Sequence, residues 1–478
     1  MENKQNDGKD KTYHFLNKGH FKYRWILLGF CIWIVAGAFF CFDVPAALHN
    51  TLRQHFSDVL TEGEFEIYFS GLYSIYSFAN IFLPFITGRM RDAMGDRIIL
   101  LQTVSFVFIG QGLFAYGVMI KSFIVMYLAR ILLGWGIESV QPIQTSFVSP
   151  YFKDDYLGLT IGMNTLFAGF GSVATMYFCP LLALKYGLLV ATSIGCLFNL
   201  FCIICAIIST SIDKCAETKM LDNIDYDKVK YMQLAQEEEQ QQQQQQQQNN
   251  QQSEVSVFEQ MKTYPKLFWL VAIYFGLNYS SVLGFINISV GFLTERWLGE
   301  DEESELKAGE MVAIMWLITG FFTPIFGFIA DKYGGRAFHC IIAGILCFVA
   351  HITLWYIYPF LSLIALGTAN AIAYASPWTG VVYLVRPDYL GKAYAVVVGI
   401  YNALFSIFPI IVGILRAYYG SYYYSQLFLS FLGLCSLITA VLIKIEDVQQ
   451  ENLIDGNKVI SATSIEENCK QNIDYDQK

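Results

Sequence analysis

The chain has 478 residues, of which 55% are hydrophobic and only 15% are charged, whereas an average soluble domain is about 25% charged. Its net charge of −9 lies largely in polar segments at the ends and in the middle, and gives no support to a nucleic-acid-binding protein. No nucleophile, base and orienting group fall together in a motif, and no phosphate loop or metal-ligand spacing is present. The sequence therefore argues against an enzyme and predicts no cofactor and no bound metal.

Apolar runs of about twenty residues, the length that a helix needs to cross the hydrocarbon core of a bilayer, recur from Trp25 to Lys444. The polar start has no apolar core, so we expect no cleaved signal peptide and a cytosolic N-terminus. Alternation from there puts most Lys and Arg on the cytoplasmic side, as the positive-inside rule requires, with both termini cytoplasmic. Twelve helices in membrane lipid are expected, over residues 25–46, 67–88, 98–119, 123–146, 157–178, 188–210, 266–291, 309–330, 338–358, 361–384, 391–415 and 421–443.

Hydropathy collapses between Ser211 and Pro265, where glutamates lead into a glutamine run from Gln240 to Gln248. Such a tract cannot bury a core, and we expect it to be disordered. It falls after six predicted spans and before six more. The predicted division is an N-terminal cytoplasmic tail 1–24, a six-helix bundle 25–210, a disordered Gln-rich cytoplasmic loop 211–265, a second six-helix bundle 266–444 and a cytoplasmic tail 445–478.

A short motif of glycine, aspartate, glycine and arginine occurs twice at identical spacing, after the second and after the eighth predicted span. The repeat indicates that the two halves are copies. Glycine permits a close turn, the aspartate can accept bonds from amides at a helix N-terminus, and the arginine supplies a counter-charge, so we interpret both copies as parts of a cytoplasmic gate. The residues are Gly88, Asp92, Gly95 and Arg97 in the first copy and Gly327, Asp331, Gly334 and Arg336 in the second.

With Arg130, Gly134 and Gly136 in the fourth span, these motifs resemble those of the major facilitator superfamily, over nearly the whole chain. That resemblance implies an all-α membrane protein with twelve transmembrane helices in two pseudo-symmetric six-helix bundles. A closer resemblance is to the family of lysosomal dipeptide transporters typified by major facilitator superfamily domain-containing protein 1. It rests on residues 43–48 (DVPAAL), Tyr73, Tyr76, Asn80, residues 136–139 (GIES), Gln144, residues 327–328, 331–332 and 334, Gly391, Ala393, Tyr394 and Asn402.

The closer resemblance implies export of dipeptides from the lysosome lumen to the cytosol by alternating access, as a uniporter, with a glycosylated single-span accessory protein as a possible partner. It also implies that the span-four glutamate, Glu138 here, faces the peptide's amine. A span-five arginine would face the carboxylate, but Gly169 stands at that place in this chain. The carboxylate contact therefore does not carry over.

Independently of any family, a carboxylate in the middle of a membrane helix is a functional candidate, and Glu138 suits an ammonium group. The alternative is a structural hydrogen bond to Gln141 or to a hydroxyl of another helix. A proton-coupled cycle would depend on Glu138, because deep carboxylates are few. Other candidate substrate-binding residues are Gln141, Tyr73, Tyr76, Asn164, Tyr374, Trp378, Tyr401 and Asn402, each of which alone is more often a packing residue.

Arg130, two turns before Glu138, is expected to be a structural or coupling residue. Asp43, followed by Pro45, either lines the mouth of the path or caps an interrupted helix, and we favour capping. Two alternatives to a dipeptide carrier remain: a carrier of organic anions or sugars with the same fold, and a solute sensor or scaffold that moves nothing. The dileucine-like Leu453 and Ile454 and the family resemblance indicate a lysosomal or other endolysosomal membrane.

Overall fold

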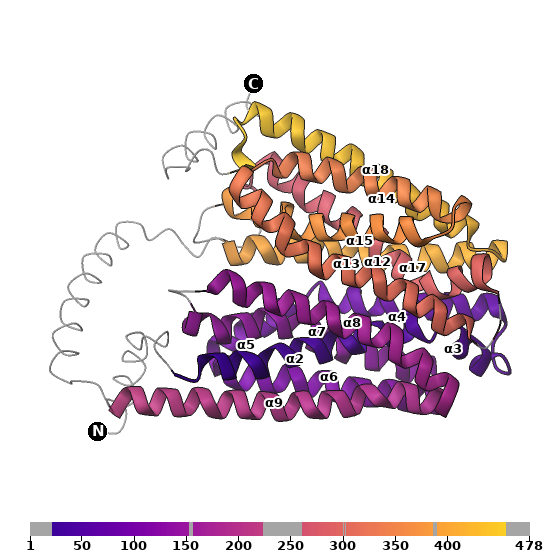
Figure 1. Ribbon diagram of the computed structural model, residues 1–478, viewed down its shortest axis with the longest axis horizontal. Coiled ribbons are helices and arrows are strands. Elements are labelled where there is room, and N and C mark those ends of the chain that lie inside the picture. The colour runs from indigo at the N-terminus through magenta and orange to yellow at the C-terminus, as the bar shows by residue number, and fades with distance from the viewer. Residues whose placement is uncertain are drawn as a thin grey trace.

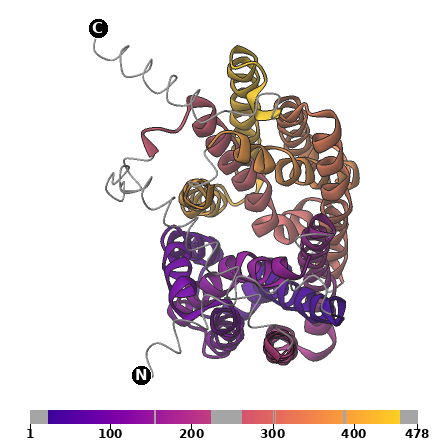
Figure 2. The ribbon, with the colours of Figure 1, turned by 90° about the vertical axis from the view of Figure 1, so that its left-hand side faces the viewer.

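The structure is a computed structural model that describes residues 22–152, 156–222, 261–299, 301, 303–385 and 390–455. Its helices form two bundles that lie side by side, the N-terminal half below and the C-terminal half above in Figure 1. Figure 2, turned to face the left-hand side, shows the two bundles as separate groups of helices.

The N-terminal half contains the long helices that the hydropathy pattern predicts, with one short helix added. After α2 the chain makes the eight-residue α3, which lies at the right-hand side of Figure 1. The helices are α2 (Arg24–Ala47), α3 (His49–Phe56), α4 (Glu62–Asn80), α5 (Leu83–Met94), α6 (Asp96–Met119), α7 (Phe123–Phe152), α8 (Leu157–Tyr186) and α9 (Leu188–Asp222).

The C-terminal half repeats this order without a counterpart of α3. Its helices are α12 (Lys266–Leu293), continued by the π-helical turn η3 (Thr294–Leu298), then α13 (Ser304–Tyr333), α14 (Arg336–Tyr356), α15 (Phe360–Ala375) with the short α16 (Pro377–Gly380) and η4 (Val381–Tyr383), α17 (Leu390–Tyr419), α18 (Tyr423–Gln449) and η6 (Leu453–Asp455).

Within the described residues, eleven helices are long and apolar enough to cross a membrane, and twelve if the bent pair α4 and α5 counts as one span. Large apolar side chains point outward from these helices: Ile124, Leu197 and Leu361 are 73%, 64% and 71% exposed. An outer surface of this kind suits hydrocarbon and not water. The fold is thus the predicted all-α membrane architecture.

One predicted span is broken, and proline accounts for the break. The span expected over 67–88 bends by 45° between α4 and α5, because Pro84 lies in the first turn of α5 and cannot donate an amide to the preceding turn. The span expected over 361–384 is confirmed as one apolar span, Phe360–Tyr383, in which α15 ends at Ala375 and the short α16 begins at Pro377.

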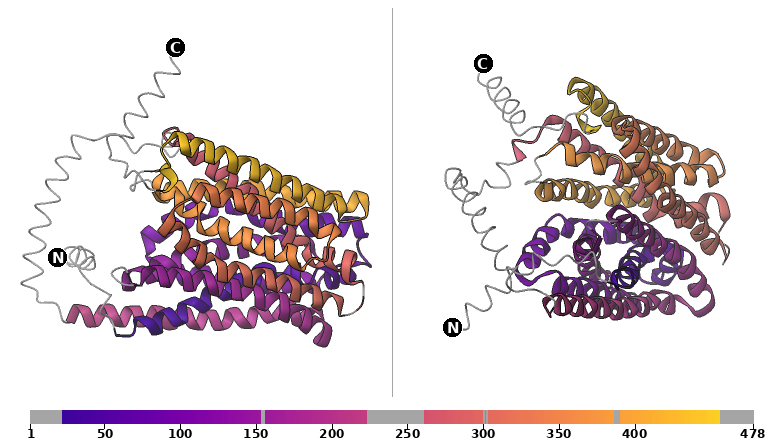
Figure 3. Two further views of the ribbon diagram at one scale, coloured as in Figure 1. Left: turned by 45° about the horizontal axis from the view of Figure 1, so that its top comes forward. Right: turned by 60° about the vertical axis from the view of Figure 1, so that its left-hand side comes forward.

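The two halves are arranged alike, because equivalent helices make equivalent contacts. In the first half α2 packs on α8 and α9, and α6 on α7; in the second half α12 packs on α17 and α18, and α14 on α15. The halves meet through two more equivalent pairs, α4 with α17 and α8 with α13. The last helix of each half, α9 or α18, lies on the outside in Figures 1 and 3.

The two ends of the molecule are named after residues that lie there. The Arg24 end carries the start of α2 and the end of α9, and the α3 end is opposite.

Helix α9 continues to Asp222, twelve residues beyond the predicted boundary at Thr210, so residues 211–222 are helical and not disordered. Ion pairs from Arg97 to Asp213 and Glu217 of this extension hold it against α6. The glutamine run and the predicted N-terminal tail lie almost wholly outside the described residues. The predicted C-terminal tail is described as far as residue 455: α18 continues past Lys444 to Gln449, and Ile454 of the dileucine-like pair is fully buried.

Candidate functional site

Glu138, in the middle of α7, contacts both halves of the molecule. The Tyr76 hydroxyl of α4 donates to Glu138 Oε1 at 3.0 Å, and the Tyr401 hydroxyl of α17 donates to Oε2 at 2.8 Å. Of the two structural hydrogen bonds considered for Glu138, the structure shows the bond to hydroxyls of other helices. No bond from Glu138 to Gln141 is found among the described residues. Because one of the two hydroxyls comes from the opposite half, Glu138 sits where the halves meet, midway along the bundle.

Aromatic rings of the C-terminal half continue from this carboxylate toward the Arg24 end. The Tyr401 ring lies 4.6 Å from that of Tyr279 and 5.8 Å from that of Phe275. Phe275 in turn lies 5.2 Å from Trp378 and 5.9 Å from Tyr374. A carboxylate beside several ring faces can bind a cation both by charge and through the ring quadrupoles.

Arg130, two turns before Glu138 on α7, is fully buried among groups of its own half. Its guanidinium donates to the Phe42 carbonyl at 3.1 Å and lies 4.9 and 5.0 Å from the ring centres of Tyr73 and Tyr76. Arg130 thus positions Tyr76, which in turn bonds Glu138. This arrangement fits the expected structural or coupling residue better than a substrate contact.

Asp43 does not cap a helix, contrary to the favoured expectation. It lies inside α2, is fully buried, and has Ser172 and Arg130 as polar neighbours. A capping carboxylate must precede a helix start, and the start of α3 lies six residues further on, where the N-cap Leu48 offers no side-chain bond. Asp43 instead faces the interior of the N-terminal half.

The remaining predicted substrate residues are held in different surroundings. Asn164 and Gln144 exchange two amide hydrogen bonds, at 3.0 and 2.6 Å, and Asn402 donates to the carbonyl of Val398 in its own helix. Tyr73 is fully buried against Arg130. The structure therefore brings Tyr76, Tyr401, Tyr374 and Trp378 into the neighbourhood of Glu138, and places Asn164, Asn402 and Tyr73 in packing contacts.

Gly169 lies in the contact between α8 and α13. A Cβ built there would be 3.7 Å from the Trp316 carbonyl oxygen and 3.8 Å from the Gly320 Cα. The α13 backbone therefore lies directly against this position. A long cationic side chain at residue 169 would have to pass between the two helices.

The two motif copies lie at the Arg24 end and bond within their own halves. In the second copy the Arg336 guanidinium pairs with Asp331 at 2.7 Å and also contacts Thr379. In the first copy Asp92 is exposed, and Arg97 pairs instead with the α9 carboxylates.

The motif glycines shape the turns that follow the second and eighth spans. Gly95 and Gly334 have φ of +82° and +69°, which glycine adopts at little cost, while Gly88 and Gly327 lie in open space. The predicted cytoplasmic gate thus makes no polar bridge across the halves among the residues described.

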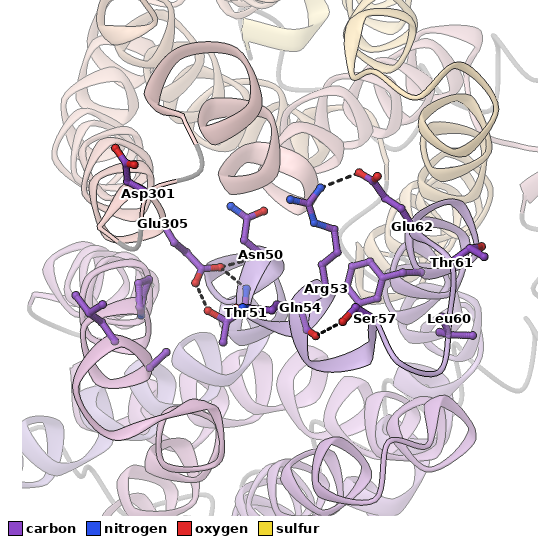
Figure 4. Close-up of a pocket in the computed structure, with 14 residues that line it drawn as sticks. Asn50, Thr51, Arg53, Gln54, Ser57, Leu60, Thr61, Glu62, Asp301 and Glu305 are labelled. Atoms are coloured by element: carbon purple, nitrogen blue, oxygen red, sulfur yellow. Dashed lines mark hydrogen bonds and ion pairs between the residues drawn. The ribbon is translucent and has the colours of Figure 1, made fainter.

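At the α3 end, by contrast, polar groups bridge the halves. Glu305 of α13 accepts from the backbone amides of Asn50 and Thr51 at 2.8 and 3.1 Å, and from the Thr51 hydroxyl. The Asn50 amide donates to Thr294 at 2.7 Å. Figure 4 shows Glu305 pointing at the start of α3. These bonds hold α3 of the first half to the second half.

A second bridge at the same end is ionic. Arg416 of α17, only 4% exposed, pairs with Glu62 of α4 at 2.7 Å and with Glu295 of η3 at 2.9 Å. Arg53 pairs with the same Glu62 at 2.8 Å. One cation and one anion of each half are thus shared in a single network.

A pocket of about 830 Å³ opens at the α3 end and not around Glu138. Figure 4 shows that Asn50, Thr51, Arg53, Glu62 and Glu305 line it. None of the predicted substrate residues lines this pocket. Several of the bridging groups described above therefore form part of the wall of a vestibule at the α3 end.

Sequence reasoning missed these bridging residues for an identifiable reason. Glu62 precedes the predicted start of the second span at residue 67, and Glu305 precedes the start at 309, so both counted as loop charges. The available signal was the placement of carboxylates within a few residues of apolar runs, where they become buried. Their partners in the opposite half, from 254 to 354 positions away, left no trace in the sequence.

Comparisons with known proteins agree with this architecture. A sequence profile described as Major Facilitator Superfamily matches residues 26–297. The mouse protein named lysosomal dipeptide transporter MFSD1 is 25% identical over 444 residues, which covers 90% of this chain and 88% of that protein. The human protein of the same name is 25% identical over 432 residues, covering 87% and 85%.

Solved structures at low identity share the fold. An auto-inhibited peptide transporter of the POT family aligns with a TM-score of 0.62 at 12% identity, covering 91% of this chain and 98% of that one. The inward-open xylose transporter XylE from E. coli aligns with a TM-score of 0.61 at 14% identity, covering 87% and 95%. The similarity extends over both halves.

Proposed function

This chain belongs to the major facilitator superfamily, and we propose that it carries small amine-bearing or cationic solutes, dipeptides among them, by alternating access. The observation that carries the proposal is Glu138, a carboxylate at the middle of the bundle that is bonded by one tyrosine of each half. An ionised carboxylate within a membrane is costly unless it is used or paired. A substrate ammonium that displaced either tyrosine would take over its place as partner.

The surroundings of Glu138 favour a cation over an anion. The rings of Tyr279, Phe275 and Tyr374 lie close to Tyr401, and ring faces attract positive charge. Arg130, the buried cation of the same helix, is already engaged by a carbonyl and by aromatic rings. These features support a substrate with a free amine or a cationic side chain. The name of the relatives, lysosomal dipeptide transporter MFSD1, supports dipeptides among such substrates.

The distribution of bridging contacts supports a state closed at the α3 end. Glu305, Arg416 and their partners join the halves there, whereas the ion pairs described for Arg97 and Arg336 at the Arg24 end lie within their own halves. We propose that the α3 end faces the lumen of a lysosomal or other endolysosomal membrane and the Arg24 end the cytosol. Transport would proceed as uniport from lumen to cytosol.

Uptake into proteoliposomes tests this function with a panel of dipeptides, amino acids, sugars and organic anions. Saturable uptake of amine-bearing dipeptides, reduced at least tenfold by Glu138→Gln, is the expected result. Glu310→Gln, which changes an exposed glutamate of α13, is the matched control and should transport normally. Equal uptake by Glu138→Gln and the control, or transport of sugars alone, would overturn the proposal.

A further inference from the structure

We propose that His49, Glu66 and Tyr422 form a proton-binding site at the α3 end, and that the bound proton keeps the two halves together there. The site is separate from Glu138, and its ligand is a proton and not the cargo. The proposal goes beyond the proposed function, because it concerns which state of the protein is populated and holds whatever solute is carried.

The three side chains are brought together from both halves and sealed from solvent. His49 of α3, Glu66 of α4 and Tyr422, which precedes α18, are 0%, 1% and 1% exposed. His49 Nε2 lies 3.3 Å from Glu66 Oε2 and 3.2 Å from the Tyr422 hydroxyl oxygen. The Tyr422 hydroxyl is also 3.1 Å from Glu66 Oε1. Each member therefore contacts the other two.

The number of hydrogens available shows which protonation state lets each of these contacts be a hydrogen bond. Asn50 donates its amide to Thr294, so its oxygen faces His49 Nδ1 at 3.1 Å and Nδ1 must carry a hydrogen. Tyr422 has one hydroxyl hydrogen, which it donates to Glu66. Nε2 then faces only acceptors, and a second proton between the imidazole and the carboxyl group allows all three contacts to be hydrogen bonds.

Loss of that proton weakens the contact between the halves. A neutral imidazole with its hydrogen on Nδ1 would turn the lone pair of Nε2 toward a carboxylate oxygen 3.3 Å away. The single hydrogen of Tyr422 could satisfy only one of these two acceptors, so the other would be buried without a donor, which is unfavourable. Tyr422 belongs to the C-terminal half, whereas His49 and Glu66 belong to the N-terminal half. Losing one of these hydrogen bonds therefore weakens the contact between the halves.

The charged groups that face the site come from both halves of the molecule. Arg416 lies near Glu66 and Tyr422, and Arg53 near Tyr422. Glu295 faces Tyr422, Glu305 faces His49, and Glu62 binds both arginines. The arginines stay charged at any physiological pH, and histidine is the side chain whose ordinary titration falls between pH 5 and 8.

The packing of the site is built for this close approach. A Cβ on Gly291 of α12 would lie 2.5 Å from the Tyr422 hydroxyl and 2.7 Å from His49 Nδ1, so only glycine leaves room for both groups. The His49 ring is held edge to face by Phe69, with ring centres 4.6 Å apart. The imidazole is thereby fixed with Nε2 toward its two partners.

The sign of the effect follows from this geometry. The closed α3 end binds the proton and the open α3 end does not hold the three groups together. Acid therefore favours the closed state, and closure is lost as pH rises through the titration of the site. One linked proton changes the ratio of closed to open molecules by at most about tenfold per pH unit.

Distance measurement on the full chain in lipid nanodiscs, without substrate, tests the site. Spin labels at Ser57→Cys of the first half and Lys307→Cys of the second, in a background without other reactive cysteines, report separation at the α3 end between pH 5 and pH 8. The short-distance population should fall severalfold or more as pH rises. His49→Gln and Glu66→Gln should abolish this response. Because no transport is measured, failure of the proposed cargo would leave the result intact.

His55→Gln is the matched control, since His55 lies on the same helix but bonds the Val118 carbonyl of its own half; it should keep the wild-type response. Tyr422→Phe, which removes only the hydroxyl, should lower the closed population at acidic pH even if a charged-residue variant fails to fold. A distance distribution independent of pH in the unmodified site, or a wild-type response in His49→Gln, would overturn the proposal.

Discussion

Replacing Glu305 with glutamine is expected to open the α3 end. The carboxylate accepts from two backbone amides and one hydroxyl of α3, across the boundary between the halves, while being only 8% exposed. An amide at this position keeps one acceptor oxygen but loses the negative charge. Hydrogen bonds to charged groups contribute about 1.5–3 kcal/mol, so losing one shifts the ratio of closed to open molecules by roughly 10- to 150-fold.

The change is measurable as the rate at which a membrane-impermeant maleimide labels Ser304→Cys, which lies beside Glu305 and is buried in the closed structure. Glu303→Gln is the control, because Glu303 forms only an exposed pair with Lys307 one turn away, and such pairs contribute about 0.3–0.5 kcal/mol. Labelling should rise at least tenfold in Glu305→Gln and stay near the parent rate in Glu303→Gln. Equal labelling of both variants would refute the assignment of Glu305 as a bridge between the halves.

Three further predictions test the packing. Gly171→Ala, whose Cβ would lie 2.1 Å from the α2 backbone, should lower stability by about 1–3 kcal/mol, whereas Gly169→Ala should be neutral; thermal unfolding in detergent compares them. Arg130→Lys should lower the unfolding temperature and uptake together, because lysine cannot reproduce the guanidinium's stacked, multiply bonded geometry; unchanged unfolding would contradict the buried contacts. Arg97→Gln should raise hydrogen exchange severalfold in residues 211–222, and unchanged protection there would show that α9 needs no ion pair.

The fold was predictable from the sequence because lipid imposes a simple requirement. Each span must be apolar over about twenty residues and must bond its own backbone, so hydropathy alone located the spans, and most helix starts lie within a few residues of the predicted positions. Pro84, at the break between α4 and α5, was visible in the sequence too, but proline alone does not say which of the spans that contain it will bend. Helix ends beyond the membrane were less predictable: α9 runs past Thr210 because of ion pairs to Arg97, which hydropathy does not register.

The candidate site was predictable only in part. Glu138 stood out because a carboxylate deep in an apolar helix needs a reason. Tyr76 and Tyr401 were among the predicted candidates, but their pairing with Glu138 was not predictable, since they lie 62 and 263 positions away from it. Asn164 and Gln144 satisfy each other, and no periodicity distinguishes such a pair from residues that face a cavity.

The bond from Glu305 makes α3 a helix whose first turn is capped by another part of the molecule. Its own N-cap, Leu48, supplies no side-chain acceptor. The amides of Asn50 and Thr51 therefore donate to the Glu305 carboxylate of α13. A helix of eight residues is marginal in isolation. When the halves separate at this end, the start of α3 is expected to unwind, so that the entrance of the carrier would differ between its two states in secondary structure as well as in width.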